Sequence, residues 1–174
     1  MDIGIVIFFS YLSGSIPFGL IVTKFYGDQD VRKIGSGNIG ATNVLRTGNR
    51  YLAAATLILD ILKGYAPVVI TQFFFTEHLQ LSALMAFLGH IFPIWLKFKG
   101  GKGVATYLGI LIAFSYGLSL LFIFTWVVVS LIFKYSSLSS IFSSLTVLII
   151  TLFRENAVKA IDPNFVFTNN IKLI

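Results

Sequence analysis

Long apolar runs separated by short polar segments make up most of the chain. A membrane-spanning helix needs about 20 consecutive apolar residues, because the hydrocarbon core of a bilayer is about 30 Å thick. Runs that approach or exceed this length cover residues 3–23, 52–76, 79–96, 104–133 and 138–153. The pattern predicts an all-α fold: a polytopic integral membrane helical bundle of about five to six transmembrane helices.

Two of these runs are predicted to be interrupted. As one straight helix, residues 104–133 would extend about 45 Å, well beyond a core of about 30 Å. The polar residues 115–117 near the middle of this run favour two short helices meeting there, and one long tilted helix is the alternative. In the first run, Pro17 predicts a kink, and the small residues around Gly14 predict close contact with another helix.

Composition supports a membrane location. Only 11% of the 174 residues are charged, and the mean hydropathy is +0.88, whereas soluble domains carry roughly 25% charged residues. The net charge of +6 comes from basic residues between the apolar runs, so it indicates membrane topology and no nucleic-acid partner. The chain has no cysteine, which excludes disulfides, thiolate metal sites and a thioester intermediate.

Charge placement predicts the orientation of the chain. The polar segment 24–50 holds five basic residues against Asp28 and Asp30, so the positive-inside rule puts it in the cytoplasm and the N-terminus outside. The first apolar run lacks the basic start and small-residue end of a signal peptide, and we interpret it as a retained span. The segment after residue 96 is then also cytoplasmic.

Two polar segments on this face have the composition of anion-binding loops. Loop 1 (residues 33–46) and loop 2 (residues 97–103) combine cations with glycines, which let backbone N–H groups approach a ligand. The candidate substrate-binding residues are Ser36, Gly37, Asn38, Gly40, Thr42, Asn43 and Arg46 in loop 1, and Lys99, Gly100, Gly101, Lys102 and Gly103 in loop 2. The alternative is a pair of flexible connectors, which would not require this combination twice.

Other motif interpretations fit these loops less well. Residues 35–40 match G-x-G-x-x-G, with Asp60 twenty residues further on, but no strand is predicted before Gly35 and Asp60 lies within an apolar run. Loop 2 lacks the upstream glycine and the following Ser or Thr of a Walker phosphate-binding loop. No nucleophile-elbow sequence surrounds Ser36, so an anion-binding hydroxyl is favoured over a nucleophile.

Few ionisable residues lie within the predicted spans. Asp60 and Lys63 are three residues apart on one helical face, so we expect them to pair, in either a structural or a site-supporting role. His90 lies one turn before loop 2, where a functional role is favoured over a purely interior one. Because His78 is expected on the opposite side of the membrane, we predict no metal site, and no cofactor is predicted.

The loops together suit a ligand with an anionic head and an apolar tail, and a resemblance makes this specific. Residues 35–43 (Gly-Ser-Gly-Asn-Ile-Gly-Ala-Thr-Asn) and residues 89–106, which begin Gly-His-Ile-Phe-Pro and include Lys-Phe-Lys-Gly-Gly-Lys-Gly, resemble the first two signature motifs of the PlsY family. Residues 13–19 are also similar to the first span of that family. PlsY enzymes are bacterial membrane acyltransferases, and the resemblance covers roughly residues 10–150.

The resemblance implies acyl transfer from acyl phosphate to glycerol 3-phosphate, giving 1-acylglycerol 3-phosphate and inorganic phosphate. It implies catalytic roles for Ser36, His90 and Lys102, a place in the bacterial inner membrane among its lipids, and a functional link to an acyl-phosphate-forming enzyme. Acyl phosphate is already activated, so no covalent enzyme intermediate is required, and the general base is either His90 or the phosphate of the substrate. Acyltransferases with thioester donors typically carry H-x-x-x-x-D, but Trp95 stands at the Asp position after His90.

The C-terminal segment departs from the family pattern. The family usually has a further span and a third cytoplasmic motif, of which Arg154-Glu155-Asn156 matches a fragment. We therefore predict a membrane-embedded acyltransferase domain over residues 1–153 and a divergent tail over residues 154–174 that is truncated or altered and poorly ordered. If residues 104–133 form two helices, the tail lies outside; if they form one, it lies inside, where the positive-inside rule favours it.

Two other classes of protein compete with the acyltransferase interpretation. A small transporter or channel would use Asp60 and Lys63 to line a pathway, and a phospholipid-binding structural protein would use the loops without catalysis. Transport requires polar residues through the depth of the spans, whereas here polarity is concentrated at one face. The distribution of polar residues therefore favours the acyltransferase over the transporter.

Overall fold

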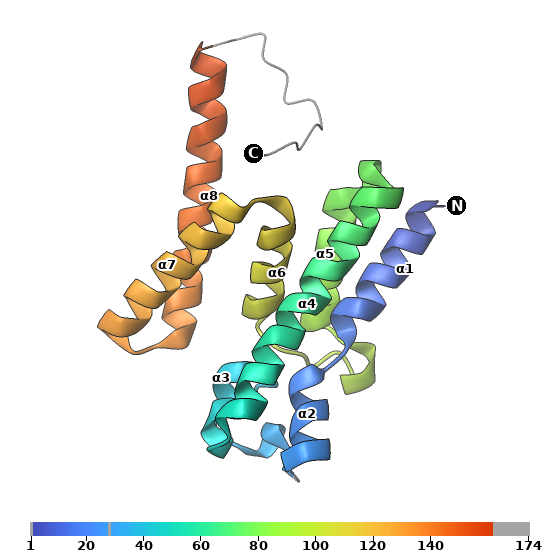
Figure 1. Ribbon diagram of the computed structural model, residues 1–174, viewed down its shortest axis with the longest axis vertical. Coiled ribbons are helices and arrows are strands. Elements are labelled where there is room, and N and C mark those ends of the chain that lie inside the picture. The colour runs from blue at the N-terminus through green and yellow to red at the C-terminus, as the bar shows by residue number, and fades with distance from the viewer. Residues whose placement is uncertain (1, 28, 162–174) are drawn as a thin grey trace. The chain divides into compact units, whose positions relative to one another are not determined.

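The computed structural model describes residues 2–27 and 29–161, and their regular structure is helical (Figure 1). The helices are α1 (Asp2–Ser15), α2 (Phe18–Gly27), α3 (Ala41–Val44), α4 (Arg50–Phe74), α5 (Leu79–Ile91), α6 (Val104–Phe114), α7 (Tyr116–Phe133) and α8 (Ser136–Ile161). Short 3-10 turns are η1 (Val31–Lys33), η2 (Leu45–Thr47), η3 (Thr76–His78) and η4 (Ile94–Leu96). The chain forms two compact units, Met1–Ala113 and Phe114–Ile174.

The described helices confirm a polytopic all-α membrane fold. Five stretches are long and apolar enough to cross a bilayer: Asp2–Gly27, Arg50–Phe74, Thr76–Leu96, Tyr116–Phe133 and Ser136–Arg154. Helix α6 is apolar but shorter than these spans. The predicted number of five to six transmembrane helices therefore agrees with the structure.

The first span is interrupted where its proline predicts a kink. Helix α1 ends at Ser15 and α2 begins at Phe18, with Pro17 between them. The amide of Leu20, which would bond to Ile16 in a continuous helix, donates instead to the carbonyl of Pro17 at 3.0 Å. The break therefore leaves the Ile16 carbonyl without its usual helical donor.

The long run 104–133 also forms two helices, as the preferred prediction states. Ser115 separates them because its backbone is extended, with φ −163° and ψ 118°. Its hydroxyl accepts a hydrogen bond from the amide of Leu118 at 3.4 Å, which caps the start of α7. One long tilted helix, the alternative left open by the sequence, is not what the chain forms.

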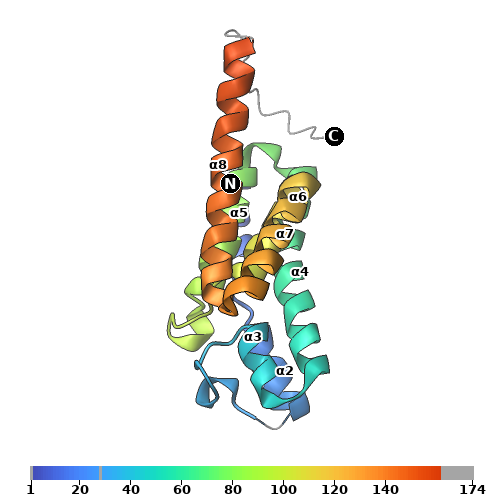
Figure 2. The ribbon, with the colours of Figure 1, turned by 90° about the vertical axis from the view of Figure 1, so that its left-hand side faces the viewer.

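Helices α7 and α8 pack side by side as a helical hairpin (Figure 2). Ser139 and Ser143 are buried in α8, and their hydroxyls donate to the carbonyls of Tyr135 and Ser139 at 2.9 and 2.6 Å. The sequence predicts that the last span ends at Phe153, but α8 continues to Ile161. Residues 154–161 include good helix formers, and the next proline, Pro163, comes only after them. Nothing within this segment therefore stops the helix. The rest of the predicted tail, residues 162–174, lies outside the described residues.

Glycines bring the helices of the first unit into backbone contact. A Cβ on Gly14 of α1 would meet the carbonyl oxygen of Ala86 of α5, and a Cβ on Gly89 of α5 would meet the carbonyl of Tyr11. Helices α4 and α6 use the same device, since Gly64 lies against the carbonyl of Thr106 and Gly109 against that of Ile61. Small residues allow this close approach, which supports helix association in lipid.

This packing predicts different effects for two glycines of the same helix. Gly14→Ala should lower the free energy of unfolding by about 1–3 kcal/mol, because the new methyl group overpacks the contact between α1 and α5. Gly4→Ala is the matched control, since a Cβ there meets nothing within 4 Å. Unfolding by denaturant in detergent micelles measures both, and equal stabilities would contradict the packing argument.

Candidate active site

Buried apolar side chains anchor loop 1 to the spans. Val31 of η1, just before loop 1, and Ile39 and Val44 of the loop are 0%, 3% and 0% exposed. They form one cluster with side chains of the neighbouring helices, Leu20 of α2 and Ala53 of α4, and Leu52 and Leu96 pack against it from outside. Leu96 belongs to η4, immediately before loop 2. The two loops therefore share a hydrophobic support, which is consistent with the prediction that they lie on one face.

The side chain of Asn43 organises the inside of loop 1. Asn43 is 3% exposed, and its amide nitrogen donates to the carbonyls of Val31, Ile34 and Asn38 at 2.9, 3.0 and 2.8 Å. Its amide oxygen accepts from the backbone N–H of Ser36 at 3.0 Å. Both amide hydrogens are thus used within the loop. The structure gives Asn43 a supporting position beneath the loop, whereas the sequence places it among ligand-binding groups.

Cations near loop 1 differ in how far they are already neutralised. The Arg32 guanidinium donates to both carboxylate oxygens of Asp30, at 2.9 and 2.7 Å, and these hydrogen bonds hold the pKa of Asp30 well below its usual range. Arg46 is exposed, and within the described part of the chain it has no carboxylate at ion-pairing distance. Its side chain lies against Gly35, which has φ +53° and no room for a Cβ beside the Arg46 side chain.

Loop 2 folds back onto the C-terminal end of α5. The amides of Gly100 and Gly101 donate to the carbonyls of Ile91 and His90 at 3.0 and 3.1 Å, which satisfies acceptors that the helix end leaves open. This corrects the expectation that these two N–H groups face an anion, because the helix end already occupies them. In loop 1, the Gly37 and Gly40 amides are likewise used, by the Ile34 carbonyl and the Asn38 side chain.

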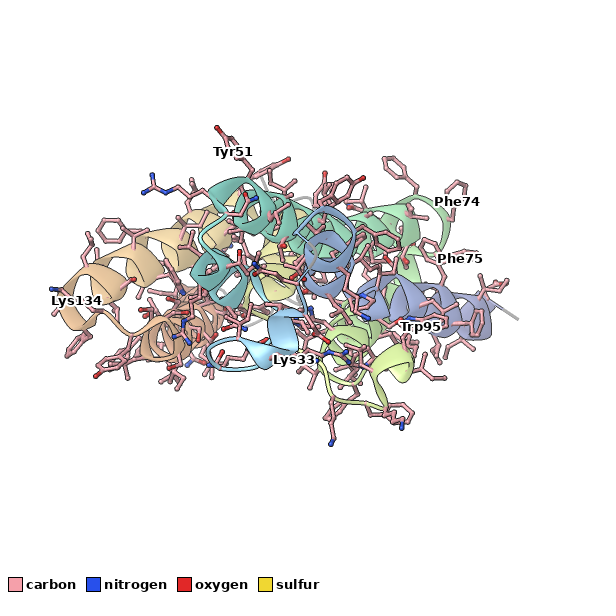
Figure 3. All side chains as sticks on the ribbon, turned by 90° about the horizontal axis from the view of Figure 1, so that it is seen from below. Lys33, Tyr51, Phe74, Phe75, Trp95 and Lys134 are labelled. Carbon is pink, nitrogen blue, oxygen red and sulfur yellow. The ribbon has the colours of Figure 1, made fainter. Side chains whose placement is uncertain are left out.

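The lysines of loop 2 point outward from this folded base. Lys97 and Phe98 both have left-handed backbone conformations, with φ 51° and 61°, which is uncommon for residues other than glycine. Lys97, Lys99 and Lys102 are all exposed. Figure 3 views the molecule from the end at which loop 1 lies, with Lys33 of loop 1 and Trp95 of η4 labelled. Loop 2 therefore offers the charges of these lysines, whereas the amides of Gly100 and Gly101 are already hydrogen-bonded.

His90 is enclosed between the two ends of the second motif. It is 3% exposed, and its Nδ1 lies 3.0 Å from the hydroxyl oxygen of Thr106 in α6. On the other side of the ring, a Cβ on Gly101 would collide with Nε2. The ring thus supports loop 2 from below. Thr106 was not singled out by sequence reasoning, because no helical or strand periodicity links two residues sixteen apart across a loop.

The predicted site residues separate by exposure. The exposed ones are Ser36, Gly37, Thr42, Arg46, Lys99 and Lys102. Asn38, Gly40, Gly100 and Gly101 are half-buried, while Asn43, His90 and Gly103 are buried. Gly103 has φ +78° and lies against the ring of Phe87, so no other residue would fit there without strain. All the cations and hydroxyls of the predicted set are among the exposed residues, whereas Asn43 and His90 lie buried beneath the loops.

The Asp60–Lys63 pair expected from the sequence is formed inside the first unit. The ammonium of Lys63 lies 2.7 Å from Oδ1 of Asp60, and the two side chains are 2% and 3% exposed. The two opposite charges are therefore in direct contact. Lys63 also donates to the carbonyl of Ile16 at 2.8 Å, at the break between α1 and α2.

An open pocket of about 640 Å³ lies beside loop 1, between the end of α2 and the start of α4. Its lining includes Thr23, Gln29, Asn49, Arg50 and Tyr51. None of the predicted site residues contributes to it. The Asn49 side chain accepts from the amides of Tyr51 and Leu52 as the cap of α4, so the pocket follows from how this helix begins. We do not assign the substrates to it.

These features define a class of protein: a multi-pass integral membrane protein with two basic, glycine-containing loops supported at the ends of its spans. A family model described as Glycerol-3-phosphate acyltransferase matches residues 4–173, a range that includes most of the segment predicted to diverge. The chain belongs to the glycerol-3-phosphate acyltransferase family, which confirms the resemblance found in the sequence.

Relatives support the same assignment. The glycerol-3-phosphate acyltransferase of Pelagibacter ubique (strain HTCC1062) is 56% identical over 156 residues, which cover 90% of this chain and 82% of that protein. The protein of the same name from Mesorhizobium japonicum is 58% identical over 139 residues, covering 80% of this chain and 71% of the relative.

Two solved structures have a similar fold. One is PlsY, an integral membrane glycerol 3-phosphate acyltransferase, in its glycerol 3-phosphate form, with a TM-score of 0.82 and 36% identity over 88% of this chain and 78% of that one. The other is the lysophosphatidic acid form, with a TM-score of 0.79, 34% identity and the same coverage. The similarity therefore extends beyond sequence motifs to the arrangement of the helices.

The position of Asn43 leads to a test of loop 1. Asn43→Ala should leave backbone groups of the loop without their hydrogen-bond partner. This should lower the free energy of unfolding by about 1–3 kcal/mol for each group that stays buried. We expect faster hydrogen exchange of the amides in residues 31–44. Asn38→Ala is the control, because its side chain accepts from the amide of Gly40, two residues away, and its loss should have a local effect. Equal exchange rates in the two variants would show that Asn43 does not organise the loop.

Proposed function

We propose that this protein transfers an acyl group from acyl phosphate to the sn-1 hydroxyl of glycerol 3-phosphate, giving 1-acylglycerol 3-phosphate and inorganic phosphate. The main support for the proposal is the similarity of the chain to PlsY, an integral membrane glycerol 3-phosphate acyltransferase. PlsY has been solved in a glycerol 3-phosphate form and a lysophosphatidic acid form, which are 36% and 34% identical to this chain. The exposed cations on two loops with a shared support fit a reaction in which both substrates carry phosphate.

The chemistry requires little from the protein beyond placement and charge. The glycerol hydroxyl attacks the acyl carbonyl, a carbon–oxygen ester bond forms, and the bond from the acyl carbon to the phosphate oxygen breaks. Arg46 on loop 1 and Lys99 and Lys102 on loop 2 would neutralise the phosphates, and the Ser36 hydroxyl would donate to an anion. The glycines and Thr42 would shape the surface around these groups. Because acyl phosphate is already activated, no acyl-enzyme is needed.

Burial of His90 bears on the choice of general base. Its ring is enclosed by Thr106 and Gly101 and is 3% exposed. A general base has to reach the proton it accepts, directly or through one water. We therefore propose that a phosphate oxygen of the substrates takes the proton of the glycerol hydroxyl, and that His90 holds loop 2 in position.

The proposal extends to the membrane. We propose that the protein lies in the bacterial inner membrane with its N-terminus outside and both loops in the cytoplasm, because basic residues concentrate in segment 24–50 and loop 2. An acyl-phosphate-forming enzyme would then deliver the donor on the same side. The alternative, a transporter using Asp60 and Lys63, is disfavoured because these side chains bind each other and the Ile16 carbonyl in a closed interior.

Donor choice is the first test of this function. Purified protein in detergent should acylate glycerol 3-phosphate from acyl phosphate and not from acyl-CoA, since the chain has no cysteine and no H-x-x-x-x-D sequence at His90. Phosphate release, measured with and without glycerol 3-phosphate, gives the rate. Efficient use of acyl-CoA would overturn the proposed donor.

The loop cations provide the second test. Arg46→Ala and Lys102→Ala should each reduce turnover about tenfold to a hundredfold, because a charge-assisted contact to phosphate contributes about 1.5–3 kcal/mol. Arg32→Ala is the control, since Arg32 is exposed but already paired with Asp30. If all three variants lose activity equally, bulk positive charge rather than these two contacts is responsible.

A further inference from the structure

We propose that the buried Asp60–Lys63 ion pair sets the position of the two substrate loops relative to each other, which makes Asp60 and Lys63 positioning residues of the acyl transfer. The inference rests on the proposed function for its catalytic consequence. Its structural content, that the pair holds the two loops at one separation, can be tested without turnover.

An ion pair is an uncommon feature of a membrane span. Asp60 and Lys63 are 2% and 4% exposed within α4. Ionisable side chains inside a bilayer are unfavourable and usually serve a particular function. A buried ion pair is also weak evidence for stability, because loss of hydration offsets most of the attraction between the charges. Packing alone therefore does not account for the pair, and its other contacts become informative.

One set of contacts leads from the pair to loop 1. The Lys63 ammonium donates to the Ile16 carbonyl at 2.8 Å and lies 5.7 Å from the centre of the Phe18 ring. These residues flank Pro17, where α2 begins. One residue further along α2, a Cβ on Gly19 would meet the carbonyl oxygen of Ile39 in loop 1. Lys63 thus holds the start of the short helix against which the loop packs.

A second set of contacts leads from the same turn of α4 to loop 2. Gly64 lies against the backbone carbonyl of Thr106 at the start of α6. The Thr106 hydroxyl contacts His90 Nδ1 at 3.0 Å, and the opposite edge of the His90 ring lies against Gly101. Adjacent residues of one helix, Lys63 and Gly64, therefore touch the supports of both loops.

This arrangement has a consequence for catalysis. Each loop keeps its internal order through its own contacts, Asn43 in loop 1 and the end of α5 in loop 2. What α4 supplies is the separation of the loops, and hence of the two phosphates they would hold. A misplacement of about 1 Å between reactants is enough to cost about a hundredfold in rate. Loss of the pair should therefore impair turnover more than binding of either substrate.

The main variant is Asp60→Asn/Lys63→Met, which removes both charges and leaves no unpaired ion in the bilayer. We expect kcat to fall about tenfold to a hundredfold, while KM for glycerol 3-phosphate changes less than about threefold, because the contacts within each loop remain. Lys63→Arg, which keeps a cation able to reach Asp60 and Ile16, should retain most of the activity. Wild-type kcat in the double variant, or equal losses in kcat and affinity, would overturn the inference.

Ser10→Ala is the matched control for loss of a buried polar contact. Ser10 and Ser82 hydrogen-bond at 2.9 Å between α1 and α5, so this variant should lower stability without reducing kcat. If Ser10→Ala and the double variant reduce kcat equally, the pair has only a general structural role and the proposal fails.

A measurement independent of turnover separates this inference from the proposed function. The chain has no cysteine, so spin labels can be attached at Lys33→Cys and Lys97→Cys, two exposed positions, one in each loop. In nanodiscs, the distance distribution between the labels should be narrow and should broaden or shift in the double variant, with no change in Ser10→Ala. An unchanged distribution in the double variant overturns the inference, and absent turnover in the wild type overturns only the proposed function.

Discussion

A polar group inside a lipid bilayer has no water to bind, so it must find its partner within the protein. This constraint accounts for the polar contacts of the first compact unit. Pro17 interrupts the first span, so the Ile16 carbonyl loses its usual helical donor; it accepts instead from the amide of Phe18 and from the ammonium of Lys63 in α4. Asp60 balances the charge that Lys63 brings into the interior. The hydroxyl of Thr23 donates to the Gly19 carbonyl one turn earlier in its own helix.

The same constraint governs the two loops where they meet the spans. The inward-facing polar groups of loop 1 are satisfied by Asn43, and those of loop 2 by the carbonyl end of α5. The exposed groups of the two loops include side-chain cations and hydroxyls, among them Arg46 and Lys102. For the proposed reaction, cations held on loops whose inner groups are hydrogen-bonded would need little rearrangement to stabilise phosphate, which is the condition for electrostatic catalysis.

Local rules were sufficient to predict the spans and their breaks. Apolar length located the membrane helices, because bilayer thickness sets the minimum length that can cross. The kink at Pro17 and the break at Ser115 followed from the missing N–H of proline and from a polar residue within an apolar run. The contact between Asp60 and Lys63 followed from their spacing of three on one helix. The predicted end of the last span at Phe153 agrees with the apolar span Ser136–Arg154, but the helix continues to Ile161 because an apolar run marks where the membrane ends, not where the helix ends.

The sequence by itself therefore determined the membrane class and the family, since composition, apolar length and motif order carry this information without knowledge of distant contacts, and it supplied the side chains that we propose bind phosphate. Only the tertiary structure decided which of those groups face outward. His90 is enclosed by Thr106 and Gly101 across a loop, and the Gly100 and Gly101 amides bind the end of α5. These partners meet only because the chain folds back on itself, and the periodicity of the sequence does not predict such contacts. Burial of a side chain depends on what packs over it, and that is decided only when the helices have assembled.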